Sequence, residues 1–186
     1  MRRPASITGG ELKGVRLVVP PKIRATEAKV RLALFNILGD FIEGARVLDG
    51  FAGSGALGLE ALSRGAAFAA FIDSDADSII ALRDNLAQLD QDVPRQAWRV
   101  MQAPIEAGMR ELSRTELPFD VIVLDPPYRS EEGKKALNSV VQYAMLAPAG
   151  IVGIEHDQRT VFPSTIGPLQ QYKQHRYGDT VLSFYR

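Results

Sequence analysis

The sequence contains no cysteine, so it can form no disulfide bond and can offer no thiolate to a metal ion. Only two histidines, His156 and His175, remain for imidazole ligation, and without a paired ligand spacing they predict no metal site. No apolar run approaches the roughly 18 residues that span a membrane, and no apolar core follows the basic N-terminus as in a secretory signal. These absences favour a single-domain cytoplasmic enzyme without a metal.

The chain also lacks net charge, because 22 basic residues balance 22 acidic ones, so no global field draws it to polyanions. This balance hides an asymmetry. Residues 1–46 hold nine Lys and Arg against four Asp and Glu, a net charge of +5, and the remaining residues therefore carry −5. A basic arm on an acidic body indicates a local contact with a polyanion, and a solvated edge without function is the alternative.

Hydrophobic periodicity divides the chain into an N-terminal extension, residues 1–40, and a larger domain, residues 41–186, within one compact unit. The extension is predicted to form a hairpin over residues 7–19 and a helix over residues 26–38, with Thr26 as its N-cap and Gly39 as its stop. From Ala45 onward strands alternate with helices, and a hairpin over residues 169–186 ends the chain. Repeated β-α units predict an α/β fold with a mainly parallel sheet covered on both faces.

Four of the predicted strands end on an acid, namely Asp49, Asp73, Asp125 and Glu155. An open parallel sheet binds its ligand beyond the carboxyl ends of its strands, so we expect these acids to meet at one edge. Glu155 either faces that pocket or caps the next loop. The row of acids predicts where the chemistry lies.

A glycine-rich turn follows Asp49, and its G-x-G-x-x-G pattern from Gly53 to Gly58 matches the dinucleotide signature. Such a turn holds a pyrophosphate or a carboxylate equally well, so the glycines do not discriminate between ligands. Spacing does discriminate, because an acid four residues before the first glycine of the pattern would repel a pyrophosphate but pair with an ammonium group. The methionine part of S-adenosylmethionine carries an ammonium and a carboxylate, and Asp73 suits a ribose diol. The alternative is a tight loop kept only for helix–strand packing.

The segment Asp125-Pro126-Pro127-Tyr128 directly follows the apolar run Val121 to Leu124. The two prolines stiffen the backbone and present only carbonyls. We expect Asp125 and the carbonyl of Pro126 to accept the two hydrogens of an exocyclic amine, and Tyr128 to stack on the ring that carries it. This would direct the nitrogen lone pair toward an electrophilic methyl, and the product would lose its proton to Asp125 or water. A Pro-Pro loop with a capping Asp is the alternative.

Five stretches carry a family resemblance over nearly the whole chain: ITGGELKGVRL, TEAKVRLALFNIL, VLDGFAGSGALGLEALSRGA, DPPY and YGDTVLSFYR. Together they resemble the bacterial small-subunit ribosomal RNA guanine-N2 methyltransferase family. DPPY alone marks amino-directed methyltransferases, whereas the N-terminal stretches point to this family. The resemblance implies a class I, Rossmann-like, S-adenosylmethionine-dependent methyltransferase whose mainly parallel seven-stranded sheet has an antiparallel last strand. It also implies methyl transfer to the exocyclic N2 amine of a guanine in 16S rRNA.

The resemblance also assigns roles to individual positions. It gives the catalytic role to Asp125, Pro126, Pro127 and Tyr128, and cofactor binding to Asp49, Phe51, Gly53, Ser54, Gly55, Asp73 and Gln102. Gln102 stands near where many relatives carry an Asp at the adenine amino group. Gly50 replaces a bulky Leu, and we expect it to loosen the wall beside the methionine moiety. The helix opening departs from the family pattern at Ala25, Lys29 and Leu32.

The substrate is expected to be an unpaired or flipped base, because a base inside a duplex cannot reach a pocket at the sheet edge. The chain leaves little room for a DNA-reading module, and one basic arm fits an assembled small ribosomal subunit better than free nucleic acid. We expect a monomer that contacts 16S rRNA through Arg2, Arg3, Lys13, Arg16, Lys22, Arg24 and Arg129. The alternatives are methylation of adenine N6 or of a protein glutamine, and a non-catalytic ribosome assembly factor.

Overall fold

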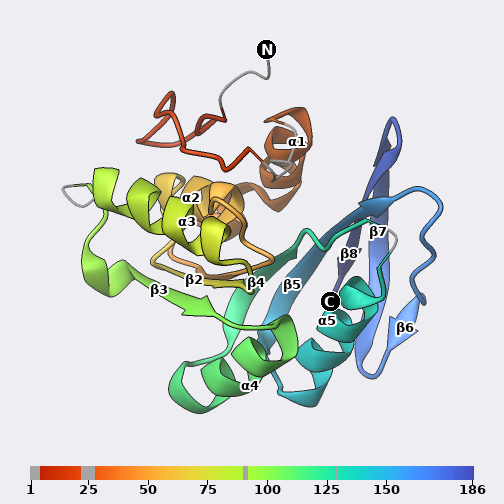
Figure 1. The fold of residues 1–186 in the computed structure, drawn as a ribbon. Coiled ribbons are helices and arrows are strands. Elements are labelled where there is room, and N and C mark those ends of the chain that lie inside the picture. Colours follow the sequence, from red (N-terminus) through yellow and green to blue (C-terminus); the bar gives the residue numbers. More distant parts are fainter. Residues whose placement is uncertain (1–4, 22–27, 90–91, 129) are drawn as a thin grey trace.

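A computed structural model describes residues 5–21, 28–89, 92–128 and 130–186 of the chain (Figure 1). Eight strands in this part form one sheet in the order β3-β2-β1-β4-β5-β8-β7-β6. The strands are β1 (Arg46–Gly50), β2 (Phe68–Asp73), β3 (Trp98–Gln102), β4 (Phe119–Leu124), β5 (Leu146–Asp157), β6 (Thr165–Ile166), β7 (Leu169–Tyr177) and β8 (Thr180–Tyr185). The helices are α1 (Ala28–Leu38), α2 (Ala56–Ser63), α3 (Ala76–Gln88), α4 (Ile105–Thr115) and α5 (Glu132–Gln142), with short 3-10 turns η1 (Gly39–Ile42) and η2 (Arg95–Ala97).

The direction of the strands confirms the predicted class I fold. Strands β1 to β5 pair in parallel, and β8 lies antiparallel between β5 and β7. The predicted C-terminal hairpin is β7 and β8. The number of strands differs from the prediction, because the two-residue β6 pairs with the start of β7 and gives eight strands rather than seven. A strand of two residues is too short for the alternation of side chains to show in the sequence.

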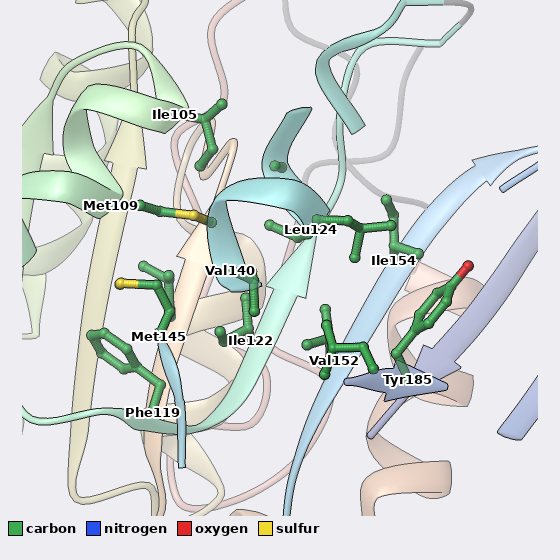
Figure 2. Packing of buried hydrophobic residues seen from close by; sticks show 14 of the residues in the cluster. Ile105, Met109, Phe119, Ile122, Leu124, Val140, Met145, Val152, Ile154 and Tyr185 are labelled. Carbon is green, nitrogen blue, oxygen red and sulfur yellow. The ribbon is translucent and has the colours of Figure 1, made fainter. Parts of the chain in front are cut away.

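Helices cover both faces of the sheet, and the side chains of the central strands alternate between the two layers. On one face, Ile122 and Leu124 of β4 pack with Met109 of α4 and Val140 of α5, as Figure 2 shows. On the other face, α1 and α2 pack on Val121 and Val123 in one cluster, and α3 packs on β2 in a second. Because β4 is buried on both faces from Val121 to Leu124, its sequence there is a continuous apolar run.

The N-terminal segment, residues 5–18, folds back on itself but forms no regular strand within its described residues. A single bridge joins Ser6 to Arg16, and Ile7 N–H donates to the carbonyl of Val15 at 3.0 Å. The predicted hairpin is therefore only partly correct. Gly10 and Gly14 adopt φ of +75° and +93°, and these left-handed positions interrupt the extended conformation that a ladder needs.

Helix α1 of the extension begins at Ala28, and the predicted N-cap Thr26 lies outside the described residues. Gly39 ends α1 with φ of +55°, as its predicted stop. The 3-10 turn η1 then leads toward β1. Among the described residues, no helix is long and apolar enough to cross a membrane.

Candidate active site

The glycine-rich turn between β1 and α2 is fixed to the end of β2 by its backbone. Ala52 N–H donates to the carbonyl of Ile72 at 2.9 Å, and Gly53 N–H donates to the Asp73 carboxylate at 2.7 Å. Gly53 and Gly55 have φ of +54° and +83°. Phe51 also has a positive φ, +67°, which costs a non-glycine residue about 1–3 kcal/mol. Such strain at the start of the glycine-rich turn indicates that the conformation is imposed by the surrounding fold.

Asp49 is fully buried in β1, just before this turn. Its Oδ2 accepts a hydrogen bond from Gly58 N–H at 2.7 Å, whereas its Oδ1 has no hydrogen-bond partner among the described residues. The pKa of Asp49 is raised to about 8, mainly by burial and to a smaller extent by the nearby Asp125 and Asp73 carboxylates, while the hydrogen bond from Gly58 N–H opposes the shift. A buried oxygen without a partner fits the predicted pairing of Asp49 with an ammonium group.

Asp73 ends β2 and is half-buried. Its two oxygens accept the N–H groups of Gly53 and Asp75 at 2.7 and 2.8 Å. A carboxylate has about four acceptor positions, so these two bonds leave capacity for the hydroxyls of a ribose. Gln102, at the end of β3, is the register partner of Asp73 and is exposed, which places the predicted adenine contact on the neighbouring strand.

Two glycines of the fingerprint are required by packing. A Cβ at Gly55 would lie 2.3 Å from Leu82 Cδ1, and a Cβ at Gly58 would lie 2.2 Å from Phe71 Cε1. Helix α2 thus sits directly against β2 and α3 at these positions. The alternative explanation of the turn, helix–strand packing, accounts for these two glycines, whereas the positive φ of Gly53 belongs to the turn itself.

The expectation that Gly50 loosens the wall beside the methionine moiety is not supported. A Cβ at Gly50 would lie 2.6 Å from Leu124 Cδ2 and 3.0 Å from Ile105 Cδ1. These two side chains already fill the space that a leucine at position 50 would occupy. The absence of a side chain is compensated by neighbours and leaves no gap at this position.

The DPPY segment begins beside the glycine-rich turn. Leu124 is the register partner of Gly50, and the N–H of the following Asp125 donates to the Gly50 carbonyl at 3.4 Å. Pro126 is buried, whereas Pro127 is exposed and its carbonyl accepts a hydrogen bond from Ser130 Oγ at 2.6 Å. The predicted acceptor surface and the predicted cofactor turn therefore lie on adjacent strands.

Tyr128 reaches from this segment to two other strands. Its hydroxyl donates to Glu155 Oε1 at 3.0 Å and lies 3.0 Å from Thr180 Oγ1. Burial raises the pKa of Tyr128 to about 12, with further contributions from the Glu155 and Asp125 charges, while the bond to Thr180 opposes the shift. Glu155 lies two residues before the end of β5, which continues to Asp157, so its prediction as a strand end is wrong. It contacts the site through Tyr128.

Thr180 is a contact that the residue-level reasoning missed. It lies in the YGDT stretch that contributed to the family resemblance, and that stretch was the available signal. The turn before it has Gly178 at φ of +64°, and Asp179 holds Gln158 through its carbonyl and its side chain at 2.9 and 2.6 Å. The hairpin of β7 and β8 is thereby fixed next to the DPPY segment.

The predicted RNA-binding cations are only partly described. Lys13 and Arg16 are exposed on the N-terminal segment, while Arg2, Arg3, Lys22, Arg24 and Arg129 lie outside the described residues. Two other cations of the basic arm form ion pairs with acidic residues of the fold. Arg31 is buried against Glu60 at 3.2 Å, and Arg46 pairs with Glu116 at 2.7 Å. The charge of residues 1–46 that is available to a polyanion is therefore smaller than the sequence count.

Glu60 of α2 fastens the N-terminal segment to the catalytic fold. Its carboxylate accepts the N–H and the hydroxyl of Thr8 at 2.7 and 2.8 Å, and it pairs with Arg31 and Arg64. Arg31 also donates to the carbonyl of Ser6. A buried acid with this many partners holds α1, α2 and the N-terminal segment together.

Asn85 of α3 makes a second connection. Its side chain exchanges hydrogen bonds with both backbone groups of Val18, at 2.7 and 3.0 Å, and donates to the carbonyl of Ser54 at 2.9 Å. Ser54 lies in the glycine-rich turn and is buried. One buried amide therefore joins the N-terminal segment to the turn, and neither Asn85 nor Glu60 was identified from the sequence.

The described residues contain no group of three or more side chains that could hold a metal ion. His156 is buried and forms a hydrogen bond with Ser183 Oγ at 2.8 Å, and burial lowers its pKa. The site instead consists of carboxylates, a glycine-rich turn and a proline-stiffened loop at the carboxyl edge of a parallel sheet. This combination defines a class I S-adenosylmethionine-dependent methyltransferase, and structural neighbours of that class share the fold.

Comparison with known proteins narrows this class. The chain belongs to the family described as "Conserved hypothetical protein 95", whose model matches residues 5–186. It is 35% identical over 182 residues to YlbH of Bacillus subtilis, a provisionally assigned rRNA methyltransferase, with 97% of both chains covered. It is 33% identical over 182 residues to "Ribosomal RNA small subunit methyltransferase D" of Escherichia coli, covering 97% of this chain and 88% of that one. The solved structure of yhhF from Escherichia coli, a provisionally assigned methyltransferase, superposes with a TM-score of 0.83 at 33% identity, covering 98% and 97%.

Proposed function

We propose that this chain transfers a methyl group from S-adenosylmethionine to the exocyclic N2 amine of a guanine in 16S rRNA. The observation that carries the proposal is the contact of Asp125 N–H with the Gly50 carbonyl, which puts the DPPY segment beside the cofactor turn. The rRNA substrate is supported by the name of the Escherichia coli relative, to which 97% of this chain aligns. The guanine amine rests on the resemblance in sequence.

The cofactor supplies an electrophilic methyl group on a sulfonium. The residues of this chain fit its polar groups, with Asp49 Oδ1 toward the ammonium, Asp73 toward the ribose hydroxyls and the exposed Gln102 toward the adenine. The N-terminus of α2, which follows the turn, suits the carboxylate. We therefore assign Phe51, Gly53, Ser54 and Gly55 to cofactor binding through the backbone of the turn.

The acceptor side needs no covalent nucleophile. Asp125 and the Pro126 carbonyl accept the two amine hydrogens, and this directs the nitrogen lone pair toward the methyl carbon. A cofactor bound at the turn would supply the methyl group, and its sulfur would retain the electron pair of the broken carbon–sulfur bond. The methylated nitrogen then gives its proton to Asp125 or to water. Tyr128 stacks on the base, and the stiff backbone of Pro126 and Pro127 keeps the acceptors in place.

The substrate is bound by the basic arm. Lys13 and Arg16, both exposed, are the described members of the surface that we assign to rRNA phosphates. We assign the same role to Arg2, Arg3, Lys22, Arg24 and Arg129. The proposal places a monomer in the cytoplasm, acting on 16S rRNA within an assembled small-subunit particle. Residues 1–40 serve as the RNA-contact extension, and residues 41–186 as the catalytic domain.

Labelling distinguishes this function from the alternatives. The protein is incubated with methyl-labelled S-adenosylmethionine in four parallel reactions. Each reaction contains one substrate: small subunits from an undermethylated strain, stripped 16S rRNA, DNA or protein. Digestion to nucleosides should place the label in N2-methylguanine of 16S rRNA, and most strongly with subunits. Label found only in N6-methyladenine or methylglutamine would show that the acceptor is another planar amine. Light scattering of the same preparation tests whether the protein is a monomer.

A further inference from the structure

The Tyr128 hydroxyl is held by groups from two strands that lie far away in the sequence. Glu155 of β5 and Thr180 of β8 are buried, with 7% and 6% of their surfaces exposed, and each lies 3.0 Å from the phenol oxygen. A carboxylate can only accept, so the phenol donates its proton to Glu155. The Thr180 hydroxyl is then left to donate to the phenol oxygen. Both hydrogen-bonding functions of the phenol are thereby engaged.

The sheet itself brings these two groups together. In the antiparallel pair of β5 and β8, Glu155 is opposite Leu182 and Asp157 is opposite Thr180. Glu155 and Thr180 are therefore diagonal neighbours on one face, about 7–8 Å apart at Cα, which leaves room for a hydroxyl between them. The contacts of Asp179 with Gln158 fix the turn that precedes Thr180. The two partners of the phenol are part of a rigid frame.

The Tyr128 ring is thus constrained at both ends. Its backbone follows two prolines, which limit rotation of the main chain, and its hydroxyl is bonded to two strands. A ring fixed in this way loses little freedom when a base stacks on it, and it keeps the base in one plane relative to Asp125. With its pKa raised to about 12, the phenol is neutral at physiological pH and keeps the proton that it shares with Glu155.

We propose that Glu155 and Thr180 are positioning residues for methyl transfer, which act by fixing the Tyr128 ring as the platform for the target base. The inference rests on the proposed amine methyltransferase function. It also gives the YGDT stretch a role, because its Thr180 supplies one of the two contacts with the platform. Neither residue touches the reacting atoms, so each should act on turnover through Tyr128 alone.

A double-mutant cycle tests this dependence. Tyr128→Phe and Thr180→Val each remove one hydroxyl with little change of shape. Thr180→Val should lower kcat by about threefold to tenfold, the effect of one neutral hydrogen bond. Tyr128→Phe also removes the bond to Glu155 and should lower kcat by at least as much. The double variant should be no slower than the slower single variant, because Thr180 has nothing to position once the phenol is gone. Cofactor affinity by calorimetry should stay within about twofold in every variant. Thr180→Ser and Glu155→Gln, which keep a donor and an acceptor, should stay close to wild type.

Tyr185→Phe is the matched control. Tyr185 is at the opposite end of β8, and its buried hydroxyl donates to the Pro163 carbonyl at 3.0 Å and to Gln171 Oε1 at 3.2 Å. Removing it should lower the melting temperature about as much as Tyr128→Phe does, without changing kcat. Equal losses of kcat in the two variants would mean that Tyr128 is merely structural.

The results separate this inference from the proposed function. Multiplicative effects of Tyr128→Phe and Thr180→Val, or an unaffected Thr180→Val enzyme, would overturn the positioning role while leaving guanine methylation intact. If the wild-type enzyme methylates a different amine, the proposed substrate is wrong and the same cycle is measured on that amine. Crystal structures of wild type and Thr180→Val give a readout that needs no activity. A displaced or disordered ring in the variant supports the inference, and an unchanged ring contradicts it.

Discussion

On the cofactor side of the site, Asp49 is bonded to Gly58, nine residues later, and Asp73 is bonded to Gly53, 20 residues earlier. On the acceptor side, Tyr128 is bonded to Glu155 and Thr180, 27 and 52 residues away. The cofactor side is organised by one β-α-β unit and its turn. The acceptor side depends on the antiparallel strands that complete the sheet. A motif can therefore be identified locally while the groups that make it rigid come from the far end of the chain.

The largest effect should come from removing the acceptor carboxylate. Asp125→Asn should lower kcat by about 10²–10⁴-fold, the range for loss of a positioned proton acceptor, while calorimetric cofactor affinity changes little. The control is Asp120→Asn at the start of the same strand, where the carboxylate accepts the N–H of Arg46 at 2.8 Å. If the Asp125 variant keeps full activity, the acceptor site is misassigned, and the comparison between a cofactor side and an acceptor side no longer holds.

The second largest effect tests whether contacts from outside the β1-α2-β2 unit stabilise the cofactor side of the site. Glu60→Gln leaves the buried Arg31 without its counter-charge and should reduce the free energy of unfolding by about 3–5 kcal/mol in urea titrations. Glu116→Gln removes the partly exposed pairs with Arg46 and Arg99, and should cost only about 0–1 kcal/mol per pair. Similar losses in the two variants would contradict the anchoring role assigned to Glu60.

A smaller effect concerns protons at Asp49. Its pKa of about 8 means that the carboxyl is largely protonated in the free protein near neutral pH. Pairing with an ammonium requires the charged form, so cofactor binding should release a proton, and affinity should rise by up to about tenfold per pH unit from pH 6 toward 8. Calorimetry in buffers of different ionisation enthalpy measures that proton. Asp49→Asn should abolish the release, and a proton still released by this variant would exclude Asp49 as its source.

The same shift has a consequence for stability. Because folding raises the pKa of Asp49, the protonated form stabilises the folded state at low pH. This contribution is fully present below the pKa of the unfolded chain and is lost as the pH rises toward about 8. Relative to Asp49→Asn, wild type should therefore lose stability between about pH 4 and 8. Parallel pH profiles for the two proteins would mean that Asp49 is ionised in the fold.

The smallest effect concerns the exposed cations of the N-terminal segment, which belong to neither the cofactor side nor the acceptor side of the site. Changing Lys13 and Arg16 together to Ser should weaken binding of small subunits and reduce the slope of log affinity against log salt by about 1–2. Arg114→Ser, at an exposed position of α4, removes a cation from the opposite face of the sheet and should leave that slope unchanged. Equal slopes for all three proteins would remove the described N-terminal cations from the RNA surface.

The sequence predicted the α/β class, the parallel direction of the early strands and the C-terminal hairpin, because hydrophobic alternation and β-α repetition are local signals. It also predicted that Asp49, Asp73 and DPPY lie at the carboxyl ends of neighbouring strands, because each stands at the end of an apolar run, while their chemical roles stay predictions. It could not predict that Leu124 and Ile105 fill the space at Gly50, since that packing depends on how β4 and α4 meet β1. The partners Glu60, Asn85 and Thr180 were missed for the same reason, because nothing in their local sequence shows what lies opposite them in the fold.

The bridge of Asn85 between Val18 and Ser54 affects how the enzyme can be dissected. A truncation before residue 20, designed to remove only RNA contacts, would also leave a buried amide unsatisfied beside the turn and strip Thr8 from Glu60. Loss of activity in such a deletion could not be ascribed to substrate binding. The boundary near residue 40 is thus a poor place to cut, graft or exchange modules, and point changes at exposed cations are the cleaner route to the same question.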